Sequence, residues 1–229
     1  QAHKAWGNFD RDKADFRKVA PTGKLNHIFY RIHGGSQDTQ VGFDTEFFDI
    51  CNKNKIACLA SWHGIGHSGN EPGITLDLAL FPGDANTDVR LDKLLPVFTN
   101  STGNAKYAVS GDPGFDRRGH YNLGLSWHSK NTIDDASELS VPLKYKAFKN
   151  FTTDPVNLPF PDMKKKITAS VTLRRAQNFI ITPGATYNWT RGTQSGTVVA
   201  HPTLPEVTID GIKFISSENA YKNLVLTKP

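Results

Sequence analysis

Residues 121–127, Tyr-Asn-Leu-Gly-Leu-Ser-Trp, and residues 139–147, Leu-Ser-Val-Pro-Leu-Lys-Tyr-Lys-Ala, alternate apolar side chains with polar or small ones. Successive side chains of a β-strand point to opposite faces, so this period of two indicates strands with one buried face. The pattern recurs at residues 74–80 and 167–173. Because short alternating segments are separated by Gly, Pro, Asn and Asp, the sequence predicts an all-β fold, either a sandwich or a barrel-like sheet.

Helical periodicity is scarce elsewhere in the chain. The best candidate for a short helix is residues 88–98, where Val89, Leu91, Leu94 and Phe98 fall near one helical face. Further strands are predicted at residues 26–32, 41–50, 55–61, 105–110, 177–182, 196–200, 205–209, 212–216 and 223–227.

A proline-rich segment suggests a boundary between two parts of the chain. Residues 151–162 contain Pro155, Pro159 and Pro161, which remove backbone donors and resist strand pairing. We therefore predict a first domain at residues 1–155 and a second β-domain at residues 156–229. The second domain is short for a complete sandwich.

Composition and charge limit the classes to which the protein can belong. Of 229 residues, 38% are hydrophobic and 21% charged, an ordinary globular balance. No apolar run approaches the roughly 18 residues of a membrane-spanning helix, so no membrane span is expected.

The net charge is +5, and residues 151–229 carry nine basic against five acidic side chains. Aromatic residues do not interleave with the basic clusters, so we expect no nucleic-acid partner. Such a surface favours anionic cell-surface glycans.

The two cysteines bear on the cellular compartment. Cys51 and Cys58 are separated by six residues, a spacing that suits a hairpin closed by a disulfide; the alternative is two reduced thiols in a core. The chain opens at Gln1 and its one methionine is Met163, as expected after removal of a signal peptide. Together these features predict a secreted protein.

A pair of histidines follows the second cysteine. His63 and His67 flank Gly64-Ile65-Gly66, and on a regular strand both would point to the same side. His120 is the best third candidate, because it opens an alternating strand and points away from that strand's apolar face. Three imidazoles with one open position would bind zinc and leave room for a ligand. The alternative is that these histidines are surface or hydrogen-bonded residues.

Enzyme motifs are absent from the sequence. The residues between His63 and His67 supply no general base, so the metalloprotease pattern HExxH is missing, as are GxSxG and the P-loop. We therefore expect a binding protein rather than an enzyme. Trp62, beside His63, is expected to line a pocket formed with the histidines.

The segment from Cys51 to His67, followed after an intervening stretch by Arg117-Arg118-Gly119-His120, resembles the receptor-binding domain of bacterial chaperone–usher fimbrial tip adhesins. It is most similar to the zinc-dependent tip adhesins of mannose-resistant, Proteus-like fimbriae. The resemblance implies that His63, His67 and His120 hold zinc. Trp62, beside His63, and Arg118, within the matching segment, are the predicted ligand contacts. It covers about residues 40–128, and the closely spaced histidines of that family are separated by one residue rather than by three.

Residues 165–171, Lys-Lys-Ile-Thr-Ala-Ser-Val, resemble the opening strand of pilin domains, whose immunoglobulin-like fold lacks a final strand. This implies a neighbouring fimbrial subunit as partner, which completes the sheet by donor-strand complementation. A periplasmic chaperone and an usher are further implied partners on the way to the cell surface.

The prediction is thus a fimbrial tip adhesin with an immunoglobulin-like or jelly-roll β-sandwich, which attaches a bacterium to a host glycan or another surface receptor. Two alternatives stay open. One is a secreted zinc hydrolase, and the other is a structural fibre subunit or shell protein without a ligand site.

Overall fold

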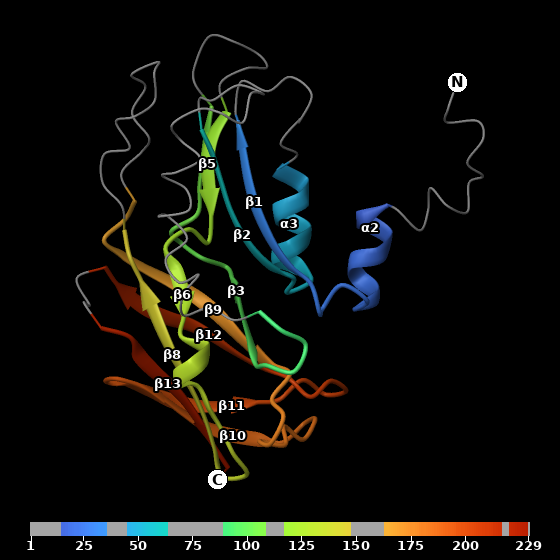
Figure 1. Cartoon of the computed structure of the whole chain (residues 1–229), viewed down its shortest axis with the longest axis vertical. Coiled ribbons are helices and arrows are strands. Elements are labelled where there is room, and N and C mark those ends of the chain that lie inside the picture. The colour runs from blue at the N-terminus through green and yellow to red at the C-terminus, as the bar shows by residue number, and fades with distance from the viewer. Residues whose placement is uncertain are drawn as a thin grey trace.

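A computed structural model describes residues 15–35, 45–63, 89–108, 117–147, 163–216 and 220–228. For residues 31–35, 45–46, 61–63, 106–108 and 117–118 it describes the backbone alone. Three sheets form most of the regular structure and confirm the all-β prediction, while the two described α-helices lie on the side of the first sheet (Figure 1). None of the described helices is long and apolar enough to cross a membrane.

The first sheet has the strand order β1-β2-β5-β4. The strands are β1 (Phe29–Gly35), β2 (Ala57–His63), β4 (Ala105–Ala108) and β5 (Arg117–Tyr121). β1 and β2 are parallel, and parallel neighbours need a crossover connection. Helix α3 (Thr45–Lys53) lies in that connection and buries Phe48 against Tyr121 of β5, with ring centroids 5.5 Å apart. The short helices α2 (Phe16–Val19) and η2 (Ala20–Thr22) precede β1.

The second and third sheets form a sandwich below the first sheet in Figure 1. The second sheet has the order β11-β10-β13-β8-β6, with β7 paired to β8, and the third has the order β12-β9-β3. Their strands are β3 (Leu95–Thr99), β6 (Leu125–Trp127), β7 (Ile133–Asp134), β8 (Glu138–Tyr145), β9 (Lys166–Arg174), β10 (Thr186–Arg191), β11 (Gln194–Val199), β12 (Val207–Ile215) and β13 (Lys222–Thr227).

One apolar core joins the two halves of the chain. β3 pairs with β9, and β8 pairs with β13, so each sheet of the sandwich contains strands from both sides of residue 155. Trp127 and Phe214, which come from opposite sides of that residue, are buried in the same cluster. The predicted boundary therefore does not separate two independent cores, because the apolar face of β8 is covered by strands that come later in the chain. Residues 151–162 themselves lie outside the described part.

The helix predicted at residues 88–98 is wrong in its described portion. Residues 95–99 form strand β3, and all five are buried. A short, fully apolar run has no alternation that would distinguish a buried strand from a helix. Pro96 is tolerated because β3 lies at the end of its sheet.

Two other predicted strands are also corrected. Residues 45–50, predicted as strand, belong to helix α3. Residues 177–182 form an irregular segment, held instead by side-chain hydrogen bonds to its backbone. The strand predicted at residues 74–80 lies outside the described residues.

A tight turn divides the strand predicted at residues 121–127. Asn122 and Gly124 have φ values of 54° and 82°, in the left-handed region that Asn and Gly adopt most easily. A Cβ atom on Gly124 would overlap the backbone oxygen of Lys146. The turn sends Tyr121 into the cluster under α3, whereas Leu125 and Trp127 enter the core of the sandwich.

Candidate functional site

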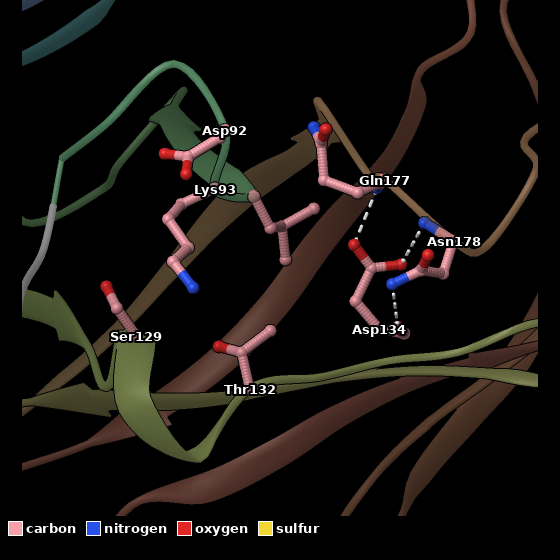
Figure 2. A pocket seen from close by; sticks show the side chains of 8 residues that line it. Asp92, Lys93, Ser129, Thr132, Asp134, Gln177 and Asn178 are labelled. Carbon is pink, nitrogen blue, oxygen red and sulfur yellow. Dashed lines mark hydrogen bonds between the residues drawn. The ribbon is translucent and has the colours of Figure 1, made fainter.

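A polar pocket of about 350 Å³ lies where three segments distant in the sequence meet (Figure 2). One segment precedes β3, the second runs through the 3₁₀ helix η3 (Ser129–Asn131) into β7, and the third follows β9. The lining residues are Asp92, Lys93, Leu94, Ser129, Thr132, Asp134, Gln177 and Asn178. Seven of these eight side chains are polar or charged, so the pocket suits a hydrophilic molecule.

Asp134 builds one wall of the pocket. Its carboxylate accepts hydrogen bonds from the backbone N–H groups of Gln177 (2.6 Å), Asn178 (3.1 Å) and Phe179 (2.8 Å). In return, the Asn178 amide donates to the Asp134 carbonyl at 2.9 Å. Since Asp134 holds three backbone donors at once, its main effect is to fix the segment that carries Gln177.

The other two charged lining residues differ in their partners. The Asp92 carboxylate is bound by both Nε and Nη2 of Arg90, at 3.0 and 2.9 Å, and this pairing lowers the pKa of the Asp92 carboxyl. Lys93 forms no ion pair with any residue of the described ranges. Figure 2 shows its ammonium pointing into the pocket between Ser129 and Thr132.

Hydroxyl and amide groups complete the lining. Thr132 donates its hydroxyl hydrogen to the His128 carbonyl at 3.2 Å, which leaves the hydroxyl oxygen as an acceptor. The Gln177 amide nitrogen donates one hydrogen to the Arg175 carbonyl at 2.8 Å, and the amide keeps a second N–H and an acceptor oxygen. A few polar groups of this kind around a small cavity orient a bound molecule.

The predicted metal ligands are only partly described. Ser61 of β2 is the register partner of His120 of β5, and His63 lies two residues beyond Ser61. The backbones of His63 and His120 are therefore on neighbouring strands. His67 lies outside the described residues. In the same register, the backbone of His33 in β1 is opposite Ser61, a proximity that sequence spacing did not indicate.

His120 is a buried residue, contrary to the expectation that its side of the strand lies outside the core. Only 2% of its surface is exposed. Burial, together with the nearby Lys164 ammonium, lowers the pKa of His120 to about 4, because both disfavour a positively charged imidazole. Its ring is therefore neutral at pH 7, the form that binds a metal, but the Lys164 charge repels a cation. Among described side chains, no group of three metal-binding residues occurs.

The two predicted ligand contacts lie in the same sheet as His120. Trp62 of β2 pairs with Gly119 of β5, and Arg118 of β5 pairs with Tyr107 of β4. Only the backbone of Trp62 and Arg118 is described, so their predicted role is neither supported nor contradicted by a contact.

Cys51 and Cys58 lie in the cluster under α3 as buried thiols, not as the predicted disulfide. The hairpin expected around them is instead the end of α3 followed by β2. Their side chains share a hydrogen bond, and this bond, with burial, raises the pKa of Cys58. The disulfide between Cys51 and Cys58 therefore stays a prediction. The two side chains that would form it are already neighbours.

Sequence reasoning missed every residue of the polar pocket. Its three segments contain common loop residues with no motif, and only the folded chain brings them together. Comparison of the chain with protein-family models, with curated proteins and with solved structures found no match. The pocket and the described contacts are thus the basis for the functional proposal.

Proposed function

We propose that this protein is an adhesin of the fimbrial tip type, which attaches a bacterium to a surface by binding a glycan in the polar pocket. The observation that carries the proposal is the pocket lining, in which hydroxyl and amide groups of Thr132 and Gln177 surround a cavity of about 350 Å³. This volume is near the lower limit of ligand pockets, about 300 Å³, and suits one or two sugar units.

The proposal moves the ligand site away from the predicted histidine loop. The pocket is formed at one end of the sandwich, between the loop before β3, η3 and the segment after β9. Loops at the end of a rigid β-sandwich are common positions for binding residues, because the sheets hold them while the loops contact the ligand. Here Asp134 adds rigidity by binding three backbone N–H groups.

Glycan binding is tested by titrating the protein with a panel of neutral and acidic glycosides and following amide chemical shifts by NMR. We expect shifts at Lys93, Thr132 and Gln177, and a loss of affinity of about tenfold in Thr132→Val, which removes one polar contact. Thr186→Val is the matched control, because Thr186 is exposed on β10 and does not line the pocket. Binding of no glycan, or equal binding by the two variants, would contradict the proposal.

Zinc dependence is a second element of the proposal. It is supported by the neighbouring backbones of His63 and His120 and by the neutral ring of His120, while the Lys164 ammonium opposes it. The test is metal analysis of the purified wild type and His67→Ala, with glycan binding measured before and after a chelator. One zinc per chain in the wild type and less in the variant would support the site. Equal binding with and without the chelator would remove zinc from the proposal.

The fimbrial partners remain part of the proposal. β11 ends the second sheet within the described residues, and its sequence, Gln-Ser-Gly-Thr-Val-Val, has neither a charge nor a proline to block pairing with another strand. This edge suits strand addition by a neighbouring subunit, with chaperone and usher delivering the protein to the surface. Thr197→Lys on the exposed face of β11 is expected to reduce incorporation into fibres and to leave glycan binding unchanged.

A further inference from the structure

The three charged side chains that line the pocket differ in the partners that they have within the protein. Asp92 is paired in fork geometry with Arg90, and Asp134 accepts three backbone hydrogen bonds. Lys93 lines the same cavity and has no carboxylate within ion-pair distance among the described residues. Lys93 is thus the one charged residue of the lining that is exposed and whose side chain has no protein counter-ion or hydrogen-bond partner among the described residues, so its ammonium is available to a ligand.

We propose that the bound glycan is acidic, and that the Lys93 ammonium binds a carboxylate of the sugar. This inference rests on the proposed glycan-binding function and names the class of its ligand. A hydrogen bond between ammonium and carboxylate is stronger than one between neutral groups. The net charge of +5 adds a long-range attraction for such a ligand.

The neighbours of Lys93 match the rest of an acidic sugar. The Thr132 hydroxyl and the Gln177 amide nitrogen each donate one hydrogen to a backbone carbonyl, at 3.2 and 2.8 Å. The Thr132 and Gln177 oxygens remain as acceptors, and the Gln177 amide keeps a second N–H. Sugar hydroxyls are the donors that these oxygens require. The pocket thus combines one cationic donor for a carboxylate with acceptors for hydroxyl groups.

A peptide carboxylate fits this lining less well. Leu94 is the one apolar residue of the lining, and it is 6% exposed. An apolar peptide side chain would meet a lining that is mostly polar, whereas a sugar ring with several hydroxyl groups finds polar groups to bind there. We therefore assign the carboxylate to a sugar rather than to a peptide terminus.

The test compares matched glycosides that differ only in charge. Methyl glucuronoside, methyl galacturonoside and methyl sialoside are titrated against their neutral counterparts by NMR or calorimetry, with acetate as a bare carboxylate. We expect at least one acidic glycoside to bind about tenfold more tightly than its neutral counterpart, the effect of one charge-assisted hydrogen bond. Raising the salt concentration is expected to weaken the acidic ligand selectively.

Variants of Lys93 test whether its ammonium causes the preference for the acidic glycoside. Lys93→Gln is expected to remove the preference for the acidic glycoside, and Lys93→Arg to retain most of it. Lys130→Gln is the matched control, because Lys130 is an exposed lysine of η3 that does not line the pocket. An unchanged preference in Lys93→Gln would overturn the role of Lys93.

The outcomes separate this inference from the function on which it rests. If a neutral glycoside shifts the pocket resonances as strongly as its acidic counterpart, the acidic ligand class is wrong and glycan binding stands. If acetate binds as tightly as the acidic glycosides, the site recognises a carboxylate alone and the sugar assignment is wrong. If no glycoside of the panel binds, both the inference and the proposed function fail.

Discussion

The guanidinium carbon of Arg191 lies 4.3 Å from the ring centre of Phe214, and at most 1% of either residue is exposed. Arg191 belongs to β10 of the second sheet and Phe214 to β12 of the third, so the contact joins the two sheets. Nη1 of Arg191 also donates to the Lys213 carbonyl at 2.9 Å. A cation stacked on a ring and bonded to a carbonyl is a favourable way to bury an arginine between sheets.

Replacement of Arg191 by Ala is expected to lower the free energy of unfolding by about 3 kcal/mol, because it leaves a cavity and removes both the contact with the Phe214 ring and the hydrogen bond to the Lys213 carbonyl. Arg191→Met fills part of the space that the arginine occupied, so its free energy of unfolding is expected to fall by less than that of Arg191→Ala. Urea unfolding measures both values. Arg17→Met is the control, since Arg17 forms an exposed ion pair with Asp15, and such pairs contribute about 0–1 kcal/mol. A loss below 1 kcal/mol in Arg191→Ala would refute the bridging role.

Asn122 is expected to stabilise the junction between the first sheet and the sandwich. Its amide donates to the carbonyls of Cys58 and Phe98, at 3.0 and 2.8 Å, from a residue that is 1% exposed. Asn122→Gly keeps the left-handed backbone accessible but loses both hydrogen bonds, so the free energy of unfolding is expected to fall by about 2–3 kcal/mol. Asn122→Ala adds about 1 kcal/mol of backbone strain.

The difference in the free energy of unfolding between the two Asn122 variants reports the backbone strain, and chemical unfolding measures it. Asn188→Ala serves as control, because Asn188 is an exposed residue of β10. If the Gly variant is as stable as the wild type, the two hydrogen bonds contribute nothing. If Ala is no worse than Gly, the backbone conformation is not strained for an alanine.

His120 is expected to make stability depend on pH between about 6.5 and 4. The unfolded chain protonates near the ordinary pKa of 6.5, whereas burial lowers the folded pKa to about 4. The unfolded state therefore binds the proton first as pH falls, so stability is full above 6.5, decreases down to about 4 and levels off below that. The loss from this group is on the order of 3 kcal/mol.

The measurement is urea unfolding at a series of pH values, with a chelator present so that metal release does not contribute. His120→Gln cannot protonate, so its curve is expected to be flatter than that of the wild type over this window, whatever its absolute stability. Parallel curves would show that His120 does not cause the pH dependence.

Cys51 and Cys58 are expected to form a disulfide when the chain refolds with oxidised glutathione. Two exchange steps would transfer the electrons of both thiols to glutathione disulfide, which leaves as two reduced glutathione molecules. The short loop predicts a gain of about 2–3 kcal/mol in stability. Mass spectrometry under non-reducing conditions should find two hydrogens fewer, and Cys58→Ala is the control. Persistence of both thiols after oxidative refolding would contradict this prediction.

Local alternation was enough to predict strands such as Glu138–Tyr145 and Lys166–Arg174, which the structure contains. It failed at residues 95–99, because a fully buried edge strand has no polar face to reveal the period. It also failed at Asn122 and Gly124, where left-handed backbone turns an apparently continuous strand. These features depend on what packs against the segment, and that information is not local.

The candidate site was less predictable than the fold. His63 and His120 attracted attention because imidazoles bear recognisable chemistry, whereas Lys93, Thr132 and Gln177 are ordinary surface residue types. Nothing in their spacing relates a lysine before β3 to a glutamine after β9. Their proximity follows from the pairing of β3 with β9 and from the Asp134 carboxylate, which holds the segment of Gln177.

The sequence by itself determined that this chain forms a β-rich fold with a buried apolar core, because period-two alternation directly encodes one buried face per strand. Only the tertiary structure decided that strands on both sides of residue 155 share that core and that Lys93 faces Thr132 in a polar pocket. Strand pairing and pocket formation depend on contacts between residues far apart in the chain, and no local pattern specifies which of those contacts form.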